Sequence, residues 1–435
     1  MNSGREAQAY ASRANSTIAL LSRNHDYRVL WGSQALSAFG GNAAGIAFPL
    51  LMLAITHSPA TVGIVLGTIA AASLLVGLPA GALVDRWDRK KIMLSCEIAD
   101  VVATGSIVVT LWWSGTVSVL HVILVAVVWG ICGAMFGPAE DACLPNLVPG
   151  EQLSTAVSLN AARGHLAALI GTAVGGFLFA VGRFVPFAVD VLTRIMGFFA
   201  LLFLRVPPRQ VRTEPLSRLG HEMAAGLSWM WKHRPIRVIG LFAVGLNMFF
   251  AAYFIIIVVL AQARGVSSAA IGIMAAMMGV GGILGSLVAP YLYQKLSPYL
   301  AIIGVFWALT LLTPLAIFID NGYLMGTLFA AMAFLAPTAN TTVDTYQLLL
   351  TPDELRGRMS SVMGVFIGCA GVAGPALGGF LMEIVPHNQA VLLCAAGIGV
   401  VTVLGTISRT LRRFPRHAAT EIKAPEKEGE QRVGE

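Results

Sequence analysis

Long apolar stretches alternate with short polar segments along almost the whole chain. Twelve of these stretches reach the length of about 20 residues that a helix needs to cross the hydrocarbon core of a membrane. They cover residues 28–55, 60–84, 92–114, 118–147, 155–181, 184–205, 237–261, 269–293, 297–319, 322–349, 359–384 and 388–409. Turn-forming pairs such as Ser58-Pro59 and Asn321-Gly322 separate them, and the alternating segments of about ten residues that mark barrel strands are missing. The pattern predicts an all-α, polytopic membrane protein with twelve transmembrane helices.

The composition supports a membrane-embedded chain and excludes several other classes. Hydrophobic residues make up 56% of the 435 positions and charged residues only 12%, whereas soluble proteins carry roughly 25% charged residues. A soluble enzyme or a nucleic-acid-binding protein is therefore excluded, despite the net charge of +7. The five cysteines lie inside apolar stretches without metal-ligand spacing, which favours a packing role.

Basic residues are confined almost entirely to one set of loops. If both termini lie on one side of the membrane, only four of the 29 basic residues fall outside the segments on that side. Arg183 and Arg264 then lie in loops of the opposite side, and Arg163 and Arg194 lie within apolar stretches. Basic loops stay on the cytoplasmic side. We therefore expect a multi-pass protein of the bacterial cytoplasmic (inner) membrane with both termini in the cytoplasm.

The same pattern predicts how the chain is divided. A cytoplasmic N-terminal segment covers residues 1–27, and an N-terminal six-helix bundle covers 28–205. A cytoplasmic linker over 206–236 contains an amphipathic stretch, which is either a helix on the membrane surface or only a charged tether. A C-terminal six-helix bundle covers 237–409, and the mixed-charge tail 410–435 is expected to be disordered.

The two predicted bundles resemble each other in sequence. When the chain is shifted by 203 residues, Pro149 falls on Pro352, and Asp141 in the fourth stretch falls on Asp344 in the tenth. The glycines of the fifth stretch fall on those of the eleventh in the same register: Gly171, Gly175 and Gly176 match Gly374, Gly378 and Gly379. Such a parallel repeat of six helices is typical of transporters with a substrate site between the halves, near the middle of the membrane.

The loop after the second stretch contains a dense motif of glycine, acidic and basic residues. It reads Gly81-Ala-Leu-Val-Asp85-Arg86-Trp-Asp-Arg89-Lys90. The motif resembles the signature of the major facilitator superfamily at the same place, with Asp88 where the signature has its second glycine. Pro138-Ala139 and the run 144–149 are similar to segments of the superfamily's drug, macrolide-efflux and enterobactin-exporter branch. This resemblance implies two pseudo-symmetric six-helix bundles that export small molecules.

The same resemblance implies a gating role for this loop. Asp85 would contact the N-terminus of the eleventh helix near Gly357, where exposed N–H groups favour an acid. Arg86 and Arg89 would pair with acids at neighbouring helix ends, and these contacts together would stabilise the outward-facing state. The alternative is that basic residues such as Arg89 and Lys90 only fix the topology.

The fifth and eleventh stretches share a spacing of small residues. Gly374-Pro375 followed by Gly378-Gly379 is similar to the antiporter pattern of the superfamily, whereas Thr172 replaces the proline in the fifth stretch. The resemblance implies a bendable pair of helices that favours export. The alternative is that the small residues only let helices pack closely.

Ionisable residues inside the apolar stretches are costly and therefore informative. Glu140 and Asp141 in the fourth stretch lie at the same depth as Arg163 in the fifth, since they are equally far from the turn between them. Two acids facing one base leave a carboxylate for a proton or a cationic substrate. A buried structural ion pair is the alternative.

Four further charges lie in the third and sixth stretches. Glu97 and Asp100 follow the basic loop closely, so we expect them to pair with its basic residues. Asp190 and Arg194 are four residues apart with the acid first, which predicts a structural ion pair within one helix.

Asp344 is the main candidate for coupling to protons. The position equivalent to Arg163 in the C-terminal half is Phe366, so Asp344 has no such base to pair with. An isolated acid inside the membrane is suited to carry a proton, although a packing role is the alternative. Asn42 and Asn247 are polar residues at the middle of the first and seventh stretches and are candidates for substrate contacts.

These features predict a secondary active transporter that exports amphipathic small molecules by proton antiport. Uptake of a small metabolite by symport or facilitated diffusion is the alternative function. The sequence contains no metal-ligand cluster, nucleophile motif or phosphate-binding loop, so we expect neither an enzyme nor an ATP-driven pump, and no cofactor. The expected partners are a small-molecule substrate, protons and the lipid bilayer, and we expect a monomer.

Overall fold

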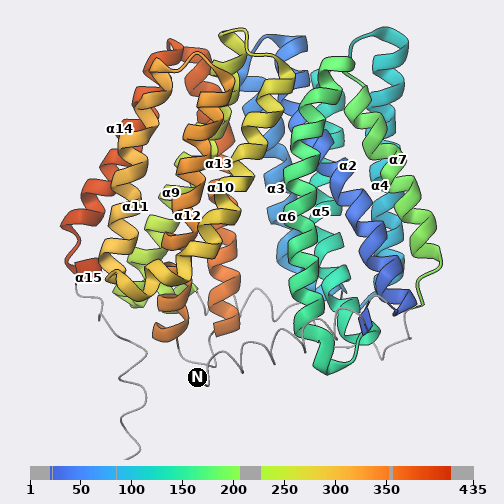
Figure 1. Cartoon of the computed structure of the whole chain (residues 1–435), viewed down its shortest axis with the longest axis horizontal. Helices are drawn as coiled ribbons and strands as arrows, with labels where there is room; N and C mark the ends of the chain where they lie inside the picture. Colours follow the sequence, from blue (N-terminus) through green and yellow to red (C-terminus); the bar gives the residue numbers. More distant parts are fainter. Residues whose placement is uncertain (1–19, 22, 85, 206–226, 352–355, 413–435) are drawn as a thin grey trace, which may run out of the picture.

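The computed structural model describes residues 20–21, 23–84, 86–205, 227–351 and 356–412, which form helices and connecting turns without a strand (Figure 1). Twelve helices are long and apolar enough to cross a membrane, so the predicted all-α polytopic fold is confirmed. The N-terminal half contains α2 (His25–Thr56), α3 (Pro59–Val84), α4 (Arg89–Ser114), α5 (Val119–Leu147), α6 (Gly150–Val181) and α7 (Val185–Leu202). The C-terminal half contains α9 (Arg234–Ala263), α10 (Ser268–Lys295), α11 (Pro298–Leu312) with η1 (Thr313–Phe318), α12 (Gly322–Leu350), α13 (Arg356–Ile384) and α14 (His387–Ile407), followed by the short α15 (Arg409–Arg412).

The ends of these helices follow from local sequence. Asp88, which departs from the family signature, is the N-cap of α4, and its side chain accepts a hydrogen bond from the Lys91 N–H. The predicted stretch 297–319 is one α-helix only as far as Leu312 and then continues as the 3₁₀ helix. Pro314 lies in this last part, where its ring removes a backbone donor from the α-helical pattern.

Each half is a six-helix bundle, and the two bundles meet through equivalent helices. In the first half, α6 packs on α2, and in the second half, α13 packs on α9. Between the halves, α3 packs on α13 and α6 packs on α10 (Figure 1). The two-fold pseudo-symmetry predicted from the repeat therefore also describes the interface between the halves.

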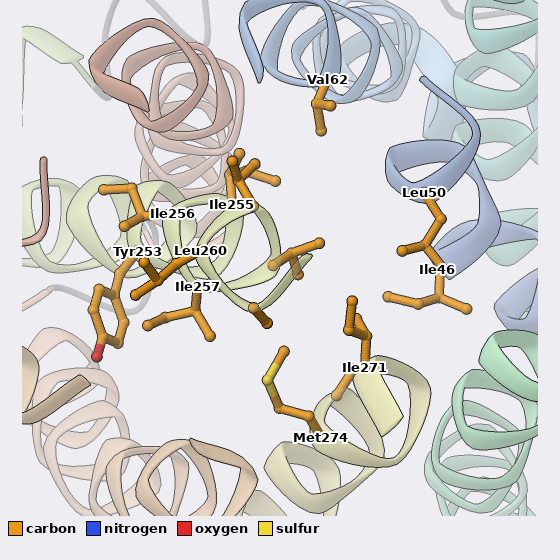
Figure 2. Packing of buried hydrophobic residues seen from close by; sticks show 14 of the residues in the cluster. Ile46, Leu50, Val62, Tyr253, Ile255, Ile256, Ile257, Leu260, Ile271 and Met274 are labelled. Carbon is orange, nitrogen blue, oxygen red and sulfur yellow. The ribbon is translucent and has the colours of Figure 1, made fainter. Parts of the chain in front are cut away.

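An apolar cluster holds the halves together near the turn between α2 and α3. Figure 2 shows Ile46, Leu50 and Val62 of the N-terminal half facing Ile271 and Met274 of the C-terminal half. All five side chains are buried and belong to one continuous cluster of hydrophobic residues. Because burial of aliphatic side chains stabilises a contact by roughly 25 cal/mol per Å² of apolar surface, this end of the interface is firmly closed.

Three of the predicted segments lie largely outside the described residues. In the linker only residues from 227 onward are described, and residues 227–232, in the predicted amphipathic stretch, are helical. Most of the predicted N-terminal segment and nearly all of the C-terminal tail fall outside the described ranges.

Candidate functional site

A buried ion pair joins the fourth and fifth transmembrane helices. Arg163 Nη1 on α6 lies 2.7 Å from Glu140 Oε1 on α5, and both residues are buried. The Asn160 side chain donates a further hydrogen bond of 3.4 Å to the same carboxylate oxygen. Of the two acids considered from sequence, Glu140 therefore meets Arg163, whereas the side chain of Asp141 is exposed. The neighbouring position along a helix points about 100° away, which separates the two acids.

A second group of charges, which we call the Arg194 cluster, consists of Glu97, Asp100, Asp190 and Arg194. Arg194 Nη1 lies 2.8 Å from Asp100 Oδ2 and 3.4 Å from Glu97 Oε2, and Arg194 Nε lies 2.9 Å from Asp190 Oδ1. The predicted pair of Asp190 and Arg194 is present. The expectation that Glu97 and Asp100 pair with the basic loop is wrong, because α7 packs beside α4 and supplies a nearer base.

Both groups of charges, with the exception of Asp190, line one cavity in the N-terminal bundle. The cavity has a volume of about 320 Å³ and is bounded by Glu97, Asp100, Glu140, Arg163 and Arg194 together with Gln34, Ser37, Trp129, Cys132 and Phe136. Ser37 on α2 donates a hydrogen bond of 2.9 Å to Glu97 Oε1. Sequence reasoning treated the two groups of charges separately and missed this common site. Their similar depth in the third and sixth stretches was the available signal.

Asp344 lies in a different environment. Its side chain on α12 is exposed, and the position is six residues before Leu350, where α12 ends. The rise of about 1.5 Å per residue places it about 9 Å from that end. Asp344 therefore lies in the last third of α12 and not at its middle.

The two candidate amides bond to their own helices. Asn42 Nδ2 donates to the Ala38 carbonyl at 2.7 Å, and Asn247 Nδ2 donates to the Ala243 carbonyl at 2.8 Å. Both side chains are only partly buried. Each amide carbonyl is still available to accept a hydrogen bond from a ligand, since Asn carries both groups.

The loop signature is only partly described. Asp85 lies outside the described residues, so its contact with α13 stays a prediction. Lys90 Nζ donates hydrogen bonds of 2.8 Å to the Leu202 and Leu204 carbonyls at the end of α7, and Arg89 Nη1 donates to the Ala142 carbonyl on α5. These side chains therefore tie α4 to the ends of two neighbouring helices. The Cβ direction of Gly81 is open.

The antiporter-like glycines lie at the closest helix contacts. A Cβ built on Gly171 would lie 2.6 Å from the Phe39 carbonyl oxygen on α2, and one on Gly374 would lie 2.6 Å from the Met248 carbonyl oxygen on α9. Gly175 and Gly378 continue these two contacts along the same helices.

Gly176 and Gly379 instead face the opposite half. A Cβ on Gly176 would lie 2.5 Å from the Gly272 Cα, and one on Gly379 would lie 2.6 Å from the Pro59 carbonyl oxygen. The carbonyl oxygen of Pro375 lies equally near a Cβ built on Gly63, at 2.5 Å. The small residues thus let α6 and α13 pack on both halves at once.

A polar contact, missed in the sequence, bridges the halves at their closed end. Glu383 Oε2 on α13 accepts hydrogen bonds from the Ser58 hydroxyl at 2.8 Å and from the Ala60 N–H at 3.3 Å. The carboxylate therefore caps the N-terminus of α3 from the other bundle. A cavity of about 460 Å³ beside it is lined by residues that include His57, Gln262 and His387.

The described residues contain no group of three or more His, Cys, Asp or Glu side chains arranged to hold a metal ion. In the Arg194 cluster, the guanidinium lies between the carboxylates, where a metal ion would otherwise lie.

The chain is similar to known export proteins over most of its length. The sequence profile of the transmembrane secretion effector family matches residues 15–433. The multidrug efflux pump Tap of Mycolicibacterium fortuitum is 27% identical over 80% of this chain and 87% of its own length. The enterobactin exporter EntS of Escherichia coli O1:K1 / APEC is 26% identical over 91% of this chain and 95% of its own length. The chain matches only about half of the macrolide efflux protein A of Enterococcus faecalis, with 30% identity over 38% of this chain and 49% of that protein.

Solved structures share the fold at low sequence identity. The nucleoside transporter NupG superposes with a TM-score of 0.70 over 89% of this chain and 100% of its own chain, at 12% identity. A bacterial homologue of the iron transporter ferroportin, in its inward-facing state, superposes with a TM-score of 0.70 over 89% of this chain and 98% of its own, at 15% identity. At these identities the likeness extends to the fold alone.

Proposed function

Since the chain belongs to the transmembrane secretion effector family of the major facilitator superfamily, we propose that it exports amphipathic small molecules across the cytoplasmic membrane. The substrate is a drug, an antibiotic, a siderophore or another secondary metabolite. The similarity to Tap and to EntS over most of both chains carries this proposal, because both relatives are exporters. The protein works as a monomer in the lipid bilayer.

Transport proceeds by alternating access of the two bundles to a site between them. The halves touch through α3 with α13 and through α6 with α10, where small residues give smooth surfaces that can rock on each other. The basic loops support a cytoplasmic position of both termini, and in that orientation the apolar cluster and the Glu383 contact close the outer end. In the change toward the outward-facing state, the contact at the outer end breaks and a contact around the Asp85 loop forms.

Export is driven by protons that move inward. Asp344 is our candidate for the coupling acid of the C-terminal half, because its exposed carboxyl exchanges protons with water while the substrate site is open to the cytoplasm. Asp141, its counterpart in the repeat, is also exposed and is the equivalent candidate in the N-terminal half. The ion pair of Glu140 and Arg163, next to Asp141 in the sequence, holds α5 against α6.

Transport in vesicles of known orientation tests this function. Inside-out membrane vesicles that contain the protein are given a macrolide, enterobactin or an amphipathic cationic dye, with and without an acidic lumen. We expect at least one of these compounds to accumulate in the lumen, and to accumulate more when the lumen is acidic. Accumulation only in right-side-out vesicles would instead identify an uptake symporter or facilitator.

A further inference from the structure

The Arg194 cluster leaves an excess of negative charge inside the N-terminal bundle. Three carboxyl groups, of Glu97, Asp100 and Asp190, share the single guanidinium of Arg194, which leaves two negative charges without a base. Arg163, which lines the same cavity, does not correct this imbalance, because it pairs with Glu140.

Burial makes that excess expensive. The side chains of Glu97 and Asp190 are 0% exposed and that of Asp100 is 4% exposed. A buried ionised carboxylate without a partner costs several kcal/mol even after the surroundings relax, and proteins normally avoid this cost by neutralising the group. Binding a proton is the simplest neutralisation for a carboxylate.

Unpartnered polar atoms show where the cavity reaches the cluster. Asp100 Oδ1 is buried without a hydrogen-bond partner, and the nearby Cys132 thiol is only a weak donor. Gln34 Nε2 on α2 is also buried without a partner, and its residue is 5% exposed. Both residues line the same cavity, so a water molecule there can bring a proton to Asp100.

We propose that the Arg194 cluster is a proton-binding site. Asp100 is the carboxyl group that exchanges the proton with water in the cavity. Glu97 shares the site, since it also lines the cavity and receives the Ser37 hydrogen bond. Asp190 does not line the cavity and keeps Arg194 in place from one turn earlier in α7.

The groups around the cluster agree with a proton as its ligand. The other titratable or charged side chains nearby are Cys96 on α4, Cys132 and Glu140 on α5 and Arg163 on α6. Glu140 and Arg163 balance each other, and a thiol is neutral unless it is activated. An organic cation is the competing ligand, because it too would neutralise the excess charge.

Helix α2 connects the Arg194 cluster to the interface between the halves. Gly40 of α2 packs against Asp190 and Thr193, and Ser37 bonds to Glu97. On its other side, α2 packs against Gly171 and Gly175 of α6, the helix that meets α10. A change of charge in the cluster therefore acts on a helix that supports the contact with the other half. This coupling to export rests on the function proposed above, whereas proton binding itself does not.

Infrared spectroscopy of the reconstituted protein tests the site without a substrate. At about pH 7, exposed carboxyl groups are ionised, so any C=O band of a protonated carboxyl reports a buried acid. We expect such a band in the wild-type protein, a clear loss of it in Asp100→Asn and in Glu97→Gln, and no change in Asp344→Asn. Addition of an amphipathic cationic dye in the absence of a pH gradient should leave this band in place.

Two results would overturn the assignment. One is the absence of a protonated-carboxyl band in the wild-type protein, a result that needs no variant to fold. The other is an unchanged band in both Asp100→Asn and Glu97→Gln. Loss of the wild-type band on dye binding, without any pH gradient, would identify an organic-cation site in place of a proton site. A band that is present in a protein without transport activity would count against the proposed function and not against the proton site.

Discussion

The third and sixth helices pack against each other in both halves, but they are joined by different chemistry. In the N-terminal half, α4 and α7 meet through Arg194 and three carboxyl groups. In the C-terminal half, α11 and α14 carry no acid, lysine or arginine and meet through hydroxyl groups, with Thr310 Oγ1 2.8 Å from Thr402 Oγ1. The Trp307 indole N–H also donates a hydrogen bond of 3.1 Å to the Thr406 hydroxyl.

This difference shows that the helix pair does not need buried charges in order to pack. Neutral hydroxyl pairs satisfy each other without the cost of desolvating ions, and replacing a buried ion pair by neutral groups is often harmless to stability. The C-terminal half therefore serves as an internal control. Charges that packing does not require, placed beside a cavity, indicate a functional requirement in the N-terminal half.

Removing the base of the cluster has the largest expected effect. Arg194→Met leaves three buried carboxyl groups without a counter-ion and should lower the free energy of unfolding by about 3–5 kcal/mol. Thr402→Val in the C-terminal half, the matched control, should cost only about 1 kcal/mol. Thermal unfolding in detergent measures both. Equal losses in the two variants would remove the distinction between the halves.

The second ion pair gives a similar but smaller effect. Arg163→Ala leaves Glu140 buried with only the Asn160 amide as a partner, and we expect a loss of about 3 kcal/mol in the same unfolding assay. Arg163→Ala combined with Glu140→Gln should recover most of that stability, because no charge is then stranded. A single variant that unfolds like the wild type would show that this pair contributes nothing to holding α5 and α6 together.

The contact at the closed end can be weakened without disturbing either bundle. Glu383→Ala removes the cap on α3 and should shift the equilibrium between conformations by about 1–2 kcal/mol, or roughly tenfold. A cysteine introduced by His57→Cys or His387→Cys should then react faster with a thiol reagent, while the unfolding temperature stays nearly the same. Glu383→Gln, which keeps an acceptor oxygen, is the control and should have a weaker effect. Unchanged labelling in Glu383→Ala would exclude this contact as a gate.

The sequence allowed the fold to be predicted because its signals are local. A helix that spans a membrane must satisfy its own backbone hydrogen bonds, so length and hydrophobicity alone locate it. The glycine register between α6 and α13 was also readable, since both copies occupy corresponding close contacts. Even Asp88, a departure from the signature, has a local explanation as a helix cap.

The site was harder to predict because partners are chosen by neighbouring helices. Helix rise gave the depth of Glu97 and Asp100, but not that α7 lies beside them, so the basic loop was the wrong partner. Glu383 was overlooked because its partners, Ser58 and Ala60, belong to the other bundle. In both cases the missing information was the lateral arrangement of the helices.

Proton-driven accumulation in liposomes is the decisive test of proton-coupled export. Wild-type protein, Asp100→Asn and Asp344→Asn are reconstituted in the inside-out orientation with an acidic lumen and a transported dye or macrolide. For one proton exchanged per substrate, the wild type should concentrate the compound about tenfold for each pH unit of the gradient. Both variants should exchange labelled for unlabelled compound but fail to concentrate it, since each lacks one acid of the proposed proton route. Accumulation that does not depend on the gradient would exclude proton-coupled export, and accumulation at the wild-type level in both variants would exclude Asp100 and Asp344 from the proton route.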